Sequence, residues 1–119
     1  MYEPPGHVTI AHGVLVTIAH LTTLGVPGVV RMIPPGVQGL LRRGSDEGVL
    51  VEVEDDRVRF DLFIIADANA HLREVGQKIQ AEVARAIRDM VGMDIEAINV
   101  HIQDVAYPEP VRSAAPTAD

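Results

Sequence analysis

The chain has 119 residues, of which 17 are acidic and 10 are basic, and it contains no cysteine. This length is typical of one domain, and the lack of cysteine excludes disulfides, thiolate metal sites and a cysteine nucleophile in this chain. The net charge of −7 argues against nucleic-acid binding, because that function needs a basic surface. Aromatic residues make up only 3% of the chain, so we expect a core of aliphatic side chains.

Residues 4–30 carry no Asp, Glu, Lys or Arg, as a membrane span would. Their longest helical piece, residues 11–24, is shorter than the roughly 20 residues that cross a bilayer. The start Met1-Tyr2-Glu3 also lacks the positive region of a signal peptide. We therefore expect a cytoplasmic protein without direct membrane insertion, formed by one domain at 1–106 and a flexible Pro- and Ala-rich tail at 107–119.

A first helix is predicted over residues 11–24, after a short extended segment that contains Val8 and Ile10. The 3.6-residue spacing assigns its buried face to Ala11, Val14, Leu15, Ile18, Leu21, Thr22 and Gly25. On this assignment Val16 and Leu24 point away from the core. A strand is expected over residues 26–33, followed by a loop at 34–47 that contains Arg42 and Arg43.

A β-hairpin is the clearest prediction. Two runs with period-2 alternation flank the acidic turn Asp55-Asp56. The alternating apolar residues are Val49, Val51 and Val53 in the first run and Val58, Phe60, Leu62 and Ile64 in the second.

A second helix is predicted over residues 69–91, with Asp67 and Asn69 as N-cap candidates and Gly92 as its end. Gly76 lies on its buried face, and we interpret it as a point of close backbone packing. The expected buried face is Leu72, Val75, Gly76, Ile79, Val83, Ala86, Ile87 and Met90. A last strand runs from Ile98 to about Val105. The order α-β-β-β-α-β predicts an α+β two-layer sandwich with both helices on one face of a small mixed sheet.

The second strand of the hairpin carries a surplus of apolar residues. Within residues 62–66 the alternation stops, so Phe63 and Ile65 place hydrocarbon on the face away from the helices. Either the 34–44 segment or a second copy of the protein must cover them. The predicted self-association surface consists of Phe63 and Ile65 together with Val16 and Leu24.

The sequence contains no recognisable motif of a metal-binding or catalytic site. His12 and His20 lie eight residues apart on one helix, and neither they nor His71 and His101 have the spacing of a metal motif. The acidic residues of 46–56 lack the order of a calcium loop. The two serines, Ser45 and Ser113, lie outside any nucleophile motif. We therefore predict no catalytic, cofactor-binding or metal-binding residue.

Several segments, taken in order, resemble the alkaline shock protein family of bacteria, which is tied to envelope stress. The resemblance spans about residues 6–106. It rests on Gly6-His-Val-Thr-Ile-Ala, Val26-Pro-Gly-Val29, the hairpin at 48–65, Val75-Gly-Gln-Lys-Ile-Gln-Ala-Glu-Val83 and Ile98-Asn-Val-His-Ile102. It implies a compact α+β domain without catalytic residues. It further implies a self-associating structural or adaptor protein near the cytoplasmic face of the envelope, sometimes recruited by a membrane-anchored partner.

The sequence leaves three functions open. The first is a non-enzymatic, homo-oligomeric scaffold or adaptor linked to envelope stress. The second is a small-ligand or metal-binding module that uses His12, His20, His71 or His101. The third and weakest is single-stranded RNA binding through Arg31, Arg42 and Arg43, against which the acidic charge and the few aromatic residues count.

Overall fold

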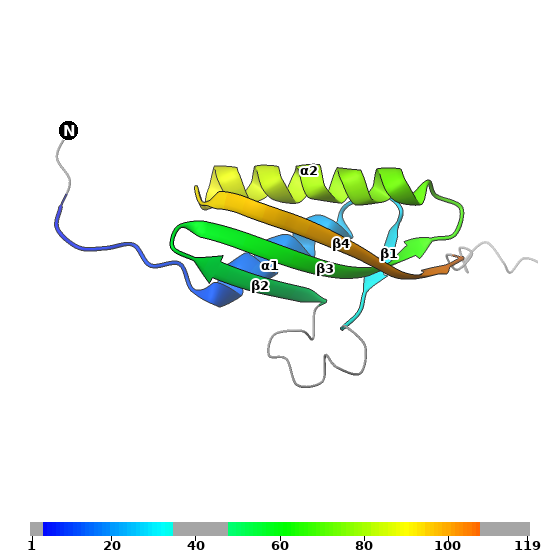
Figure 1. Cartoon of the computed structure of the whole chain (residues 1–119), viewed down its shortest axis with the longest axis horizontal. Coiled ribbons are helices and arrows are strands. Elements are labelled where there is room, and N and C mark those ends of the chain that lie inside the picture. The colour runs from blue at the N-terminus through cyan, green and yellow to red at the C-terminus, as the bar shows by residue number, and fades with distance from the viewer. Residues whose placement is uncertain (1–3, 35–47, 108–119) are drawn as a thin grey trace, which may run out of the picture.

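Residues 4–34 and 48–107 are described by the computed structural model. They form the predicted series of two helices and four strands (Figure 1). The elements are α1 (His12–Leu24), β1 (Val29–Met32), β2 (Val49–Glu54), β3 (Arg57–Asp67), α2 (Leu72–Met90) and β4 (Asp94–Ala106). The predicted tail, from residue 108 on, and the predicted loop from residue 35 to 47, with Arg42 and Arg43, lie outside the described residues.

Strand β3 is the centre of the sheet. Along one side it pairs antiparallel with β2 over the hairpin, in which Val49 lies opposite Leu62, and with β1 near Ile64. Along its other side it pairs with β4 in parallel over its whole length. The sheet is therefore mixed, as predicted, with β2 and β1 on one side of β3 and β4 on the other (Figure 1).

Both helices lie on one face of this sheet. Two parallel neighbours need a crossover connection, and α2 supplies it between β3 and β4. Helix α1 packs beside α2 and lies over β2 and β1. The two-layer α+β sandwich is confirmed, and no helix of residues 4–34 and 48–107 lies on the opposite face of the sheet (Figure 1).

The core lies between the helices and the inner face of the sheet. Alternate residues of β3 supply its centre, because successive side chains of a strand point to opposite faces. The largest fully buried side chains are Phe60, Leu62 and Ile64 of β3, Ile79, Val83 and Ile87 of α2, and Val49, Val58 and Thr23.

The buried face of α1 differs from the prediction. Leu15, Ala19 and Thr23 face the core, whereas Val14 and Leu21, predicted to be buried, are exposed. This rotates the core face by roughly one residue, about 100° around the helix. The error has a physical origin: α1 has no acidic or basic side chain, so no charge marks the side that faces solvent.

Helix α2 differs from the prediction at its start and at Gly76. It begins after His71, whose side chain makes no capping hydrogen bond to the described residues, and Asp67 belongs to β3, where its carboxylate accepts a 2.8 Å hydrogen bond from the Asn69 backbone. No described atom lies within 4 Å of a Cβ placed on Gly76. The expectation of close backbone packing there is wrong. The end residues Leu72 and Met90 are exposed rather than buried, because both ends of the helix extend past the core.

Candidate functional site

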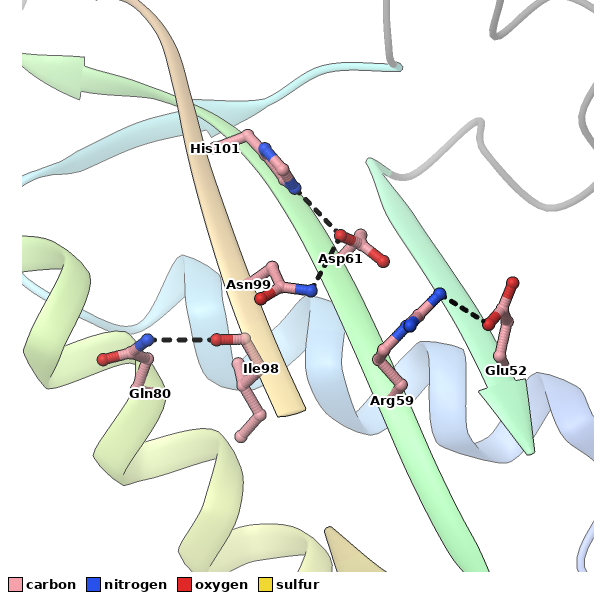
Figure 2. Close-up of polar contacts among 7 residues, drawn as sticks. All are labelled: Glu52, Arg59, Asp61, Gln80, Ile98, Asn99 and His101. Atoms are coloured by element: carbon pink, nitrogen blue, oxygen red, sulfur yellow. Dashed lines mark hydrogen bonds and ion pairs between the residues drawn. The ribbon is translucent and has the colours of Figure 1, made fainter. Parts of the chain in front are cut away.

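The helix-free face of the sheet carries a cluster of polar side chains (Figure 2). Asp61 of β3 lies at its centre. One carboxylate oxygen of Asp61 accepts a 3.1 Å hydrogen bond from the Asn99 amide and lies 2.9 Å from Nε2 of His101. Because β3 and β4 are parallel and in register here, Asn99 is directly opposite Asp61. The side chains of Asp61 and His101 are partly exposed, so the cluster is accessible to a ligand.

An aromatic contact extends the cluster along the sheet. The rings of Phe63 and His101 stack with their centroids 4.6 Å apart and an angle of 11° between their planes. Phe63 is half-buried. The stack and the contact with Asp61 together hold the His101 ring in one orientation.

An ion pair lies beside this cluster. Arg59 of β3 contacts Glu52 of β2 at 2.8 Å, and both side chains are largely exposed (Figure 2). Exposed pairs of this kind add at most about 1 kcal/mol to stability. The pair therefore adds little to stability, and its two charges cancel.

A cavity of about 710 Å³ lies at the outer edge of β2. It is bounded on one side by the polar cluster and on the other by the first turn of α1, including His12 and Gly13. It is an open hollow around an edge strand rather than an enclosed pocket.

The structure brings together two of the histidines proposed as metal ligands. His12 and His101 both line the β2 cavity, and His101 also contacts Asp61, whereas His71 precedes α2. Within residues 4–34 and 48–107, no group of three His, Asp or Glu side chains could hold a metal ion.

The four residues of the predicted self-association surface lie in different places. Val16 packs against the core, and Ile65 is only 6% exposed within the single chain. Phe63 is half-buried on the polar face. Only Leu24, on α1, presents a largely accessible side chain. The segment expected to cover Phe63 and Ile65 lies, from residue 35 on, outside the described part of the chain.

Exposed apolar surface is found instead on the outer side of α1. Val14, Leu21 and Leu24 have exposed fractions of 45%, 61% and 40%. With Thr17 they lie within about 80° around the helix, opposite the core face. We define these four residues as the outer face of α1. The sequence interpretation missed Val14 and Leu21, although the lack of charge in this helix was visible.

None of the described helices combines the length and the apolar character that a membrane span requires.

Comparisons with solved structures identify the fold. The MamM CTD in a zinc form superposes with a TM-score of 0.56 at 15% identity, over 87% of this chain and 91% of that one. A manganese form of the MamM CTD gives a TM-score of 0.56 at 17% identity, over 82% of this chain and 99% of that one. At these identities the likeness shows a shared fold.

Curated bacterial relatives span nearly the same length. The chain is 24% identical over 111 residues to the uncharacterized protein YloU of Bacillus subtilis, covering 88% of this chain and 92% of the relative. It is 26% identical over 102 residues to the uncharacterized protein Spy1535 of Streptococcus pyogenes, covering 84% and 79%. A family model described as having a cell envelope-related function matches residues 2–107. The chain therefore belongs to the alkaline shock protein 23 family.

Proposed function

We propose that this protein is a non-enzymatic, self-associating structural or adaptor protein that acts in the cell-envelope function of its family. The observation that carries the proposal is the outer face of α1. It exposes three large apolar side chains in one line on a regular helix. Contiguous apolar surface of this kind is typical of protein interaction sites.

A second copy of the same chain is the occupant that fits this face. Val14, Thr17, Leu21 and Leu24 follow the spacing i, i+3, i+7 and i+10, which is the seam along which two helices pack. The net charge of −7, counted with neutral histidines, lies wholly in the rest of the chain, because α1 contains no Asp, Glu, Lys or Arg. Two α1 helices can therefore meet without the like-charge repulsion that other parts of the surface would impose.

The expected arrangement is a two-fold dimer. A symmetric dimer uses the same patch on both copies, and an antiparallel pair of α1 helices places Val14 of one copy opposite Leu21 of the other. The Thr17 side chains then lie near the symmetry axis.

Such a dimer would serve as a scaffold or adaptor. We infer a cytoplasmic location, with recruitment to the inner face of the membrane by a membrane-anchored protein. The family description supports a role at the envelope. Catalysis is not part of the proposal, because the cavity beside the polar cluster is open rather than enclosed.

Sedimentation velocity tests the proposal. Leu21→Lys places a charge at the centre of the outer face of α1, and it should raise the dimer dissociation constant by at least about tenfold. Ala81→Lys adds the same charge at an exposed position of α2 and should leave dimerisation unchanged. A wild-type chain that remains monomeric up to high micromolar concentration would overturn the proposal.

A small-ligand site is the second candidate function. The cavity beside β2 and the Asp61–His101 pair with its stacked Phe63 favour it. A ligand that binds only the folded chain must raise its melting temperature. A thermal-shift screen of zinc, nickel, manganese and small anions would support this candidate by a shift that His101→Ala abolishes, and an absence of any shift would end it.

A further inference from the structure

The segment before α1 is an extended arm with the sequence pattern of a strand. Residues 6–10 alternate between polar and apolar side chains, and Val8 is 93% exposed. None of their backbone groups is hydrogen-bonded to another described residue, and the arm runs away from the body of the molecule (Figure 1). A strand-like segment of this kind lacks the partner that would satisfy its backbone.

The edge of β4 that faces away from β3 has no strand partner among the described residues. Strand β4 is 13 residues long and pairs with β3 on one side only among the described residues. The backbone carbonyl of Ile98 points to the outer side, where it accepts a 3.0 Å hydrogen bond from the Gln80 side chain (Figure 2). Because backbone groups alternate along a strand, those of Val100 and Ile102 also point outward, beyond the reach of this contact.

A hollow of about 230 Å³ accompanies this open part of β4. Its walls come from α2 and from β4, and include Leu72, Gly76, Val100 and Ile102. Gly76 explains why the hollow exists, since a larger residue would project a side chain into it. A glycine inside a helix is unfavourable, and no described atom lies near enough to require one here. The space at Gly76 thus serves no contact within the described chain.

We propose that the arm of one copy adds as a strand to the β4 edge of another copy, with Val8 and Ile10 directed into the hollow beside Gly76. Strand addition supplies backbone hydrogen bonds, and side-chain pockets at alternate positions supply selectivity. The inference deepens the proposed function, on which it rests for the existence of self-association, but it uses a different surface.

The occupant is an arm from another copy for two reasons. The arm leads into α1, which packs over β2 and β1, and these strands lie on the other side of β3 from β4. The arm therefore leaves the body of its own chain away from the outer edge of β4. In addition, β4 carries Asp94, Glu96 and Asp104, whereas residues 4–30 contain no Asp, Glu, Lys or Arg. The arm can lie along β4 without like-charge repulsion.

Each chain offers one arm and one β4 edge. Two copies can therefore exchange arms reciprocally and close a pair, or the contacts can continue from copy to copy as rings or open chains. Open chains, combined with the two-fold contact of α1, would link dimers into an extended assembly.

Complementation between two variants tests the inference. The parent is the full chain carrying Leu21→Lys, which removes the α1 contact, and sedimentation velocity should show species that grow with concentration. Adding Val8→Asp blocks the arm and leaves the hollow intact, whereas adding Gly76→Leu fills the hollow and leaves the arm intact. Each of these two variants should be monomeric, and an equimolar mixture should form a 1:1 complex and nothing larger.

The outcomes separate the two interfaces. A monomeric parent, variants that assemble like the parent, or a mixture that stays monomeric would each overturn the inference. If the wild type and the Leu21→Lys parent assemble equally, the α1 proposal fails while the strand addition stands. Melting temperatures at or above that of the parent establish that the Gly76→Leu variant and a milder Gly76→Ala variant are folded, and Gly76→Ala should weaken assembly by a smaller factor.

Discussion

Two buried residues, Gly48 and Thr23, have surroundings that determine the effect of a substitution. Gly48 has a φ of +77°, and a Cβ there would lie 2.8 Å from the Ile33 carbonyl oxygen and 2.9 Å from that of Phe63. These carbonyls belong to the junction at which β1 and β2 meet along β3. Thr23 is fully buried, and its hydroxyl has no hydrogen-bond partner within the described residues.

Gly48→Ala should destabilise the protein by at least about 2 kcal/mol, because a left-handed conformation costs a side-chain-bearing residue 1–2 kcal/mol before any clash is counted. Urea unfolding of the variant measures this. Gly13→Ala is the control: no described atom lies near its Cβ position, and alanine in a helix should stabilise by up to about 1 kcal/mol. Equal stability of the two variants would show that the junction at Gly48 is not packed as described.

Thr23→Val should stabilise the protein by about 1 kcal/mol, because it replaces an unpaired buried hydroxyl with a methyl group of similar shape. The free energy of unfolding by urea is the readout. Thr23→Ser keeps the hydroxyl and removes a buried methyl, so it should destabilise by about 1 kcal/mol. If valine is the less stable of the two, the hydroxyl must have a partner in solution.

Among the elements, strands were predicted better than helix faces. The hairpin at β2 and β3 follows from alternation alone, because charged and apolar side chains mark its two faces. The length of helix α1 was predicted correctly. Its buried face was not, because no charged side chain distinguishes the face that contacts solvent. The polar cluster was also beyond sequence reasoning, since Asp61 and His101 lie 40 residues apart and meet only because β3 and β4 are parallel.

The contact between α2 and β4 yields a prediction at this scale. Gln80→Ala removes the side chain that bonds the Ile98 carbonyl, and it should destabilise the protein by about 1 kcal/mol relative to Gln77→Ala. Both substitutions exchange an exposed glutamine of the same helix, so helix propensity cancels. Identical unfolding curves for the two variants would remove Gln80 as a support of β4.

In the whole molecule, a single mixed sheet is covered by helices on one face only. Its acidic surface is interrupted by two uncharged features, the outer face of α1 and the arm that precedes it. The sequence prediction of self-association rested on Phe63 and Ile65, whereas the structure buries Ile65 and exposes Val14 and Leu21. The proposed interface therefore moves from the sheet to α1.

Cross-linking through one introduced cysteine tests this interface most directly, because the chain has no cysteine of its own. Thr17→Cys lies at the centre of the outer face of α1, and mild oxidation should convert most of this variant into a disulfide-linked dimer at micromolar concentration. Ala81→Cys, on α2, should form no disulfide-linked dimer under the same oxidant, although its α1 contact is intact. Equal, slow cross-linking at both positions would contradict the account, because it would show that α1 meets no second copy.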